Sequence, residues 1–326
     1  MCRSLLALVV SLGCASSVQA STSVMIFYTQ NGSPDVFSAS YNTTTNALAA
    51  ALTIAYTQQG ADGILIGPNS TLLFGGETSN GVYQYTQTGT ELAFGAGTSS
   101  SYFLSIDQNN PSNVYTFNNA GSIAVLPVVG GLITNGALQV PSGSDTNVSD
   151  LFWSPSNTAY YLTGTTGTTG DLGTIDLSTY VTTRLFAGIA TAQDAVYDPF
   201  TGLIVLFGDG EVDTFDPSTN TLGTAVTLPG AIAGTTCAGG QFAQLDAGTV
   251  DGAGHAYVAG CGNLYYIDYS ATGNILSASD VAQSVAVPGG MKDVVVFPAE
   301  SAPEPSSVAL MLIGLAGLAI ARRRKR

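Results

Sequence analysis

The chain has 326 residues, with 22 Asp and Glu, eight Lys and Arg, and one His. From residue 21 to residue 302 only Arg184 and Lys292 stand against 21 carboxylates, a net charge of −19. This balance argues against nucleic acid and anionic membrane surfaces as partners, because phosphate binding needs clustered cations. The single His, with no G-x-S-x-G or G-x-x-x-x-G-K sequence, argues against a hydrolytic triad and against a nucleotide enzyme.

The first 20 residues predict an export signal. Arg3 begins a short basic region, residues 5–12 are apolar, and Val18-Gln19-Ala20 supplies the small residues of a cleavage site. We therefore expect cleavage after Ala20 and an exported domain over residues 21–299.

A phrase that runs from Asp through apolar residues to Pro recurs along this domain. Its copies lie at residues 62–68, 150–155, 194–199 and 293–298, with looser copies at 102–111 and 241–245. Further apolar runs follow each copy except the last, and Gly, Pro and Asn turns separate them, which predicts short strands of an all-β domain. A spacing of roughly 40 to 48 residues suits one four-stranded blade per repeat. We predict a six-bladed β-propeller, with seven blades or a β-solenoid as alternatives.

The last copy of the phrase, at Asp293, has no strands after it. Apolar runs near residues 24–28 and 35–41 can complete its blade, so that both ends of the domain close the ring and remove exposed sheet edges. Residues 294–296 are continuously apolar, which indicates an inner strand buried on both faces. We assign residues 46–56 to a strand of the first blade.

Four Asp residues begin the clear copies of the phrase: Asp62, Asp150, Asp194 and Asp293. In a closed ring they should lie at the same height, near one mouth of the central channel. Such carboxylates can hold a cation such as Ca²⁺, and their mutual repulsion would raise some of their pKa values. The alternative is that each side chain caps a turn before an inner strand. No other cofactor is indicated.

Cys237 and Cys261 are the two cysteines that remain after processing at both ends. Because an export signal implies an oxidising compartment, we expect a disulfide between them. Closing the loop of about 25 residues between them would stabilise the fold by roughly 3 kcal/mol, if the disulfide acts by lowering the entropy of the unfolded chain.

The C-terminal end combines three features. Pro303, Glu304 and Pro305 are followed by an apolar run and then by the basic residues Arg322, Arg323, Arg324, Lys325 and Arg326. An apolar helix of about 14 to 16 residues rises roughly 21–24 Å, short of the roughly 30 Å hydrocarbon core of a bilayer. The terminal cations should stay on the cytoplasmic side, which places the large domain outside.

This order of features closely resembles the PEP-CTERM sorting tail of Gram-negative bacteria. The resemblance implies a linker at 300–305, a transmembrane sorting helix at 306–321 and a basic cytoplasmic tail at 322–326. It also implies a partner, a membrane enzyme of the exosortase type, that removes the tail. The protein would then be anchored transiently in the inner membrane and later reach the cell surface or the extracellular space. An ordinary C-terminal anchor is the alternative.

The sequence contains no catalytic constellation, so a non-catalytic binding or structural role in the extracellular matrix is favoured. Exopolysaccharide or other envelope components are the expected partners. The alternatives are a secreted propeller enzyme that acts on a polysaccharide or lactone through channel carboxylates, and a scaffold that docks other proteins.

Overall fold

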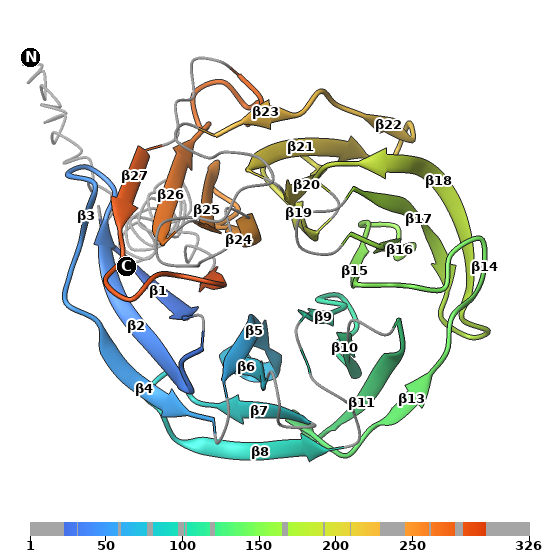
Figure 1. The fold of residues 1–326 in the computed structure, drawn as a ribbon, viewed down its shortest axis with the longest axis horizontal. Coiled ribbons are helices and arrows are strands. Elements are labelled where there is room, and N and C mark those ends of the chain that lie inside the picture. The colour runs from blue at the N-terminus through green and yellow to red at the C-terminus, as the bar shows by residue number, and fades with distance from the viewer. Residues whose placement is uncertain are drawn as a thin grey trace, which may run out of the picture.

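The computed structural model describes residues 23–30, 32–57, 60–76, 81–96, 101, 103–117, 121–164, 169–191, 193–208, 210–228, 245–260, 262–277 and 283–297. Six sheets of four or five strands surround a common axis as blades (Figure 1). The fold is the six-bladed propeller that the repeats predict, and the seven-bladed and solenoid alternatives are wrong. Among the described residues the only helical element is the short turn η1 (Pro68–Ser70).

In each blade the first strand named lies at the axis and the next ones lie successively further out, with the short strands at the outer rim. Blade 1 contains β28 (Val294–Val296), β1 (Ser23–Thr29), β2 (Asp35–Asn42), β3 (Ala47–Leu48) and β4 (Leu52–Tyr56). Blade 2 contains β5 (Ala61–Gly67), β6 (Thr71–Gly76), β7 (Gly81–Tyr85) and β8 (Glu91–Ala96). Blade 3 contains β9 (Phe103–Ile106), β10 (Asn113–Phe117), β11 (Ile123–Val129), β12 (Leu132–Ile133) and β13 (Ala137–Gln139). Blade 4 contains β15 (Asp150–Trp153), β16 (Ala159–Leu162), β17 (Gly170–Asp176), β18 (Val181–Ile189) and β14 (Ser142–Gly143). Blade 5 contains β19 (Asp194–Asp198), β20 (Leu203–Gly208), β21 (Glu211–Asp216), β22 (Thr221–Leu222) and β23 (Val226–Thr227). Blade 6 contains β24 (Leu245–Val250), β25 (His255–Gly260), β26 (Asn263–Asp268) and β27 (Gln283–Ala286).

The two ends of the domain close the ring, as the sequence predicts. Strand β28 pairs antiparallel with β1, with Val294 opposite Tyr28 and Val296 opposite Ile26. Strand β1 pairs in turn with β2. The three Val residues of β28 are buried on both faces of the strand, which explains why they form a continuous apolar run. The predicted strand at 46–56 is present as β3 and β4.

The hydrophobic core consists of six clusters, one between each pair of neighbouring blades. The inner and middle strands are therefore covered on both faces. In β20, for example, every residue from Ile204 to Phe207 is fully buried. Such strands lose the alternation of apolar and polar residues that a half-exposed sheet shows.

The same Asp turn closes the third strand of blades 4, 5 and 6. Asp176, Asp216 and Asp268 each accept hydrogen bonds from the backbone N–H and the hydroxyl of the Ser two residues later. A carboxylate that bonds its own backbone in this way favours a turn. The repeat of Asp after the third apolar run is thus a structural signal for the end of that strand.

All inner strands run in the same direction along the axis. Four of them, β28, β5, β15 and β19, start at or next to a repeated Asp. At the other end of the propeller, turns formed by residues 107–112, 154–158, 199–202 and 251–254 follow β9, β15, β19 and β24. We call this second end of the propeller the exit face. Because β28 also runs in this direction, the chain leaves the propeller at the exit face after Val296.

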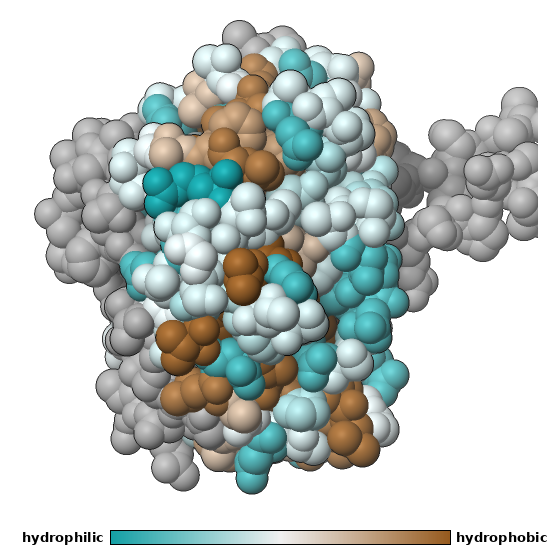
Figure 2. All heavy atoms as spheres, turned by 90° about the vertical axis from the view of Figure 1, so that its right-hand side faces the viewer, coloured by the Kyte–Doolittle hydropathy of each residue, from teal (hydrophilic) through white to brown (hydrophobic). Residues whose placement is uncertain are grey.

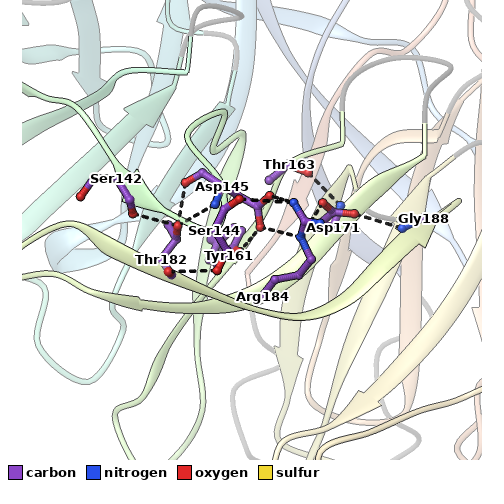
Figure 3. A network of polar contacts seen from close by, with 9 residues as sticks. All are labelled: Ser142, Ser144, Asp145, Tyr161, Thr163, Asp171, Thr182, Arg184 and Gly188. Atoms are coloured by element: carbon purple, nitrogen blue, oxygen red, sulfur yellow. Dashed lines mark hydrogen bonds and ion pairs between the residues drawn. The ribbon is translucent and has the colours of Figure 1, made fainter.

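Blade 4 carries an extra outer strand, β14, which pairs parallel with β18. Figure 3 shows the polar network beside it, in which Arg184 forms ion pairs with Asp145 and with Asp171. Asp145 also accepts a hydrogen bond from the hydroxyl of the fully buried Tyr161. These contacts fix the segment that connects blade 3 to blade 4. Around it, the outer rim mixes polar residues with scattered exposed apolar ones (Figure 2).

Several predicted features lie outside the described residues. They are the signal segment with Ala20, the two cysteines Cys237 and Cys261, and the C-terminal tail from residue 298 onward. The disulfide and the sorting helix therefore stay predictions. Within the described part of the chain, no helix has the length and hydrophobicity needed to cross a membrane.

Candidate functional site

The four repeated carboxylates lie at the start of the inner strands, as expected. Three of them accept a hydrogen bond from an inner strand of the next blade. Asp150 accepts the N–H of Ala195 at 3.1 Å. Asp194 accepts the N–H of Gly248 at 2.8 Å. Asp293 accepts the N–H of Gly63 at 2.9 Å. These contacts run around the axis and connect neighbouring blades.

The same carboxylates also bond their own strands. Asp62, Asp150 and Asp194 each accept the N–H of the following residue at 2.7–2.9 Å. In blade 3, which lacks the Asp, the Ser105 hydroxyl accepts the N–H of Leu151 and donates to Asp150. The carboxylates therefore satisfy buried backbone donors, as a capping role requires.

Asp62 differs from the other three because its second partner is a cation. Lys292 Nζ lies 2.7 Å from Asp62 Oδ2, and the Asp62 side chain is only 2% exposed. Gly63, which follows Asp62, has a φ of +47° and donates to both Asp62 and Asp293. A positive φ here forms a bulge that brings two carboxylates to one N–H, and glycine adopts this conformation without steric cost.

The environment raises several of these pKa values. Burial, together with the charge of Asp293, holds the pKa of Asp62 well above its usual range despite the nearby Lys292. Burial and the charge of Asp194 do the same to the pKa of Asp150. Burial raises the pKa of Asp194 to about 7, although the Gly248 N–H opposes this shift. The predicted repulsion between carboxylates contributes to these raised pKa values, but the removal of the carboxylates from water is the larger cause.

The ring of carboxylates was also a candidate cation site. Among the described residues, no three or more His, Cys, Asp or Glu side chains are grouped closely enough to hold a metal ion. Whether a Ca²⁺ ion binds near Asp62, Asp150, Asp194 and Asp293 stays a prediction.

A central cavity of about 500 Å³ extends along the axis from this ring toward the exit face. Asp150, Asp194 and Asp293 line its inner end. Its walls are largely apolar side chains of the inner strands, such as Leu104, and Trp153 lies nearer the exit face. The cavity therefore combines an apolar wall with two carboxylates, Asp150 and Asp194, whose pKa values are raised.

A second cavity of about 400 Å³ opens at the exit face between blades 3 and 4, and we call it the blade 3–4 groove. Its polar lining comes from turn residues of both blades: Asp107, Asn110, Ser112, Asn113, Asn157, Thr158, Asp176 and Ser178. Its aromatic lining is Tyr115 and Trp153, whose ring centroids are 5.5 Å apart. Trp153 lines both cavities.

The single histidine is held by a turn. His255 Nδ1 lies 2.6 Å from Asp251 Oδ2, and the imidazole stacks on Tyr266 at 5.6 Å. The hydrogen bond to Asp251 raises the pKa of His255. These contacts hold His255 beside the turn formed by residues 251–254.

Three important sets of contacts, those of Lys292, of Ser105 and between Tyr115 and Trp153, cannot be found from the sequence alone. Lys292 gave no signal of its own, because a lone Lys before Asp does not reveal a partner 230 positions away. Ser105 does not stand out in the sequence, because blade 3 contains only a loose copy of the repeated phrase. Tyr115 and Trp153 come from different blades, and only the packing of those blades brings them to one groove.

The tail of the chain is identified by comparison with protein families. Residues 301–325 match the PEP-CTERM protein-sorting motif. A PEP-CTERM tail implies an exported protein that is anchored in a membrane by a C-terminal segment and processed by an exosortase. The match covers the tail alone and leaves the role of the propeller open.

Solved structures share the fold at low sequence identity. A protein of unknown function from Bacteroides caccae has a TM-score of 0.55 at 12% identity, covering 84% of this chain and 99% of that one. Hydrazine synthase from Kuenenia stuttgartiensis has a TM-score of 0.50 at 13% identity, covering 89% and 99%. A streptogramin B lyase has a TM-score of 0.48 at 10% identity, covering 83% and 85%. At such identities these similarities show the fold alone. No curated protein sequence matches this chain.

Proposed function

We propose that this PEP-CTERM protein is a non-catalytic binding component of the cell surface or extracellular matrix of a Gram-negative bacterium. Its partner is an exopolysaccharide or another saccharide of the envelope. An exosortase-type enzyme releases it from transient anchoring in the inner membrane. The motif at residues 301–325 supports the sorting part of this proposal.

One observation supports the non-catalytic part. Asp150, Asp194 and Asp293 accept backbone N–H groups from neighbouring blades. Acid–base chemistry needs a carboxyl group within reach of the substrate proton, whereas these oxygens already bond the protein. In a domain with two cations, a neutral polyhydroxyl partner also fits better than a polyanion.

The test uses the processed protein recovered from its own cells and the exopolysaccharide of those cells. Co-sedimentation with the polysaccharide, without release of reducing ends, is the expected result. Turnover of the polysaccharide, or no binding at all, would contradict the proposal. Intact mass should show a chain that begins after Ala20 and lacks Arg326; a retained Arg326 would mean an ordinary membrane anchor.

A propeller enzyme is the second candidate, and it too has a specific observation in its favour. Asp150 and Asp194 line the central cavity, and their pKa values are raised. A carboxyl group with a pKa near neutrality can act as a general acid. The substitutions Asp150→Asn and Asp194→Asn would then abolish turnover of a polysaccharide or lactone in protein that is still folded by circular dichroism.

A further inference from the structure

We propose that the blade 3–4 groove binds one or two rings of a neutral saccharide. This inference rests on the function proposed above and assigns the binding site. The central cavity is not required for it, although Trp153 borders both.

The groove has a suitable size and place. Its volume of about 400 Å³ lies within the roughly 300–1,000 Å³ of small-molecule sites. It opens at the exit face, between turns that follow the inner strands of two adjacent blades. Both walls come from strands that the inter-blade core holds in place, so the groove is formed before a ligand arrives.

The charges of the groove exclude an anionic ligand. Its lining contains the carboxylates Asp107 and Asp176 and no Lys or Arg. Asp107 accepts the N–H of Asn109 at 2.9 Å. Asp176 already accepts Ser178 and the hydroxyl of Thr179. Local donors therefore occupy both oxygens of Asp176 and the Oδ1 atom of Asp107.

Apart from the second oxygen of Asp107, the remaining hydrogen-bonding capacity of the groove is neutral. Asn110 and Asn157 are exposed, and their side chains make no hydrogen bond to another described residue. Each free amide offers two donors and one acceptor oxygen. Sugar hydroxyl groups also donate and accept, so amides on both sides of a groove match a saccharide better than they match a cation or a hydrocarbon.

The aromatic pair provides the apolar part of the site. Tyr115 and Trp153 are tilted by 42° and are 6% and 8% exposed, so only the parts of the rings that border the cavities are accessible. The C–H face of a sugar ring can pack on such edges while its hydroxyl groups reach the amides.

Trp153 is also the only tryptophan of the chain, so its fluorescence reports binding at this place. The experiment titrates the processed protein with neutral oligosaccharides of glucose, mannose, galactose and xylose, with the polysaccharide of the producing cells, and with Ca²⁺ as a cation probe. The variants are Asn110→Ala, Asn157→Gly and their combination. Asn157 has a φ of +65°, and glycine tolerates this conformation.

Asn220→Gly is the matched control. Asn220 is exposed and has a φ of +52°, but it lies in a turn of blade 5 outside the groove. Both glycine variants thus remove one exposed amide from a left-handed position. The expected result is a change in Trp153 emission on adding saccharide, with affinity weakened about tenfold or more in the double variant and unchanged in Asn220→Gly.

The other outcomes separate the two proposals. If the protein binds saccharide and the double variant binds equally well, the groove is not the site, while the proposed function stands. If no saccharide binds, including the polysaccharide of the producing cells, the proposed function fails and the assignment fails with it. If only Ca²⁺ changes the emission, the groove is a cation site and the saccharide assignment is wrong.

Discussion

Lys292 and Asp62 form an ion pair that joins the two ends of the propeller, with Nζ 2.7 Å from Oδ2. Lys292 directly precedes Asp293, the residue before the last inner strand, and Asp62 lies in the first inner strand of the chain. Strand β28 pairs with β1 over only three residues. The ion pair therefore strengthens the closure where the paired backbone is short.

We expect Lys292→Met to destabilise the protein by about 3 kcal/mol, because it leaves Asp62 buried beside Asp293 without its cation. The free energy of unfolding from urea titrations measures this. Arg184→Met is the control: the Arg184 side chain is 42% exposed, so solvent screens its ion pairs and its loss should cost much less than the loss of Lys292. Adding Asp62→Asn to Lys292→Met should recover part of the loss, because the new amide is neutral and can donate to Asp293. Equal costs for the two cations would show that the ion pair does not secure the ring.

The stability of the protein should fall as the pH rises from about 4 to about 7. Folding raises the pKa of Asp194 from 3.8 to about 7, chiefly through burial. The unfolded chain therefore loses this proton near pH 4, whereas the folded protein keeps it until about pH 7. Between these values the folded state binds more protons, so raising the pH favours unfolding. Asp194 keeps some contact with solvent, so we expect a loss of about 2 kcal/mol, less than the full shift would give.

Asp194→Asn tests the source of this dependence. The variant should be less stable at pH 4, because the Ala195 and Gly248 N–H groups bond different oxygens of Asp194. The hydroxyl oxygen of the protonated carboxyl group can still accept one of them, whereas the amide nitrogen of Asn cannot. Its unfolding free energy should vary less between pH 4 and pH 7 than that of the unmodified protein. An identical slope in both proteins would assign the pH dependence to other groups, such as Asp150.

The repeats predicted the ring and its closure because they reflect local and periodic properties. Residues 294–296 must be apolar on every side, and the pattern of that strand is visible in the sequence. The Asp residues at the start of the inner strands were recognised for the same reason. The four Asp residues are not fully equivalent in their contacts, because Asp62 alone pairs with a cation, Lys292, from the far end of the chain. Contacts between blades, including the groove of Tyr115 and Trp153, depend on packing that no local pattern records.

Two buried glutamines offer a contrast in hydrogen bonding. Gln84 is fully buried, and its side chain bonds Thr71, Gly131 and the N–H of Ile133, each at 2.9 Å. Gln193 is 1% exposed, and neither polar atom of its side chain has a hydrogen-bond partner among the residues that the structure describes. We expect Gln193→Leu to stabilise the protein by about 1 kcal/mol, because it removes an unsatisfied buried amide.

Gln84→Leu should instead cost about 3 kcal/mol, since it leaves the Gly131 carbonyl and the Ile133 N–H buried without a partner. Thermal unfolding of both variants checks this pair of expectations. If Gln193→Leu is as harmful as Gln84→Leu, Gln193 bonds a water molecule or another group in solution, and the amide is needed.

The direction of β28 predicts how the precursor is oriented at the membrane. The chain leaves the exit face after Val296, and Pro303 follows seven residues later, a distance of at most about 25 Å when extended. The predicted sorting helix begins three residues beyond Pro303. While the tail is attached, the exit face should therefore lie close to the membrane surface, and the blade 3–4 groove with it.

Cysteine labelling in cells tests this orientation. Asn157 is exposed at the exit face, whereas Thr169 is exposed in the loop between β16 and β17 of the same blade, at the opposite end. In cells without exosortase activity, a membrane-impermeant maleimide should label Asn157→Cys several-fold more slowly than Thr169→Cys, with the unmodified protein giving the background from Cys237 and Cys261. The two rates should become similar once the tail is removed. Equal rates in the anchored precursor would mean that the residues after Val296 let the propeller turn freely, and that the groove is open to ligand before processing.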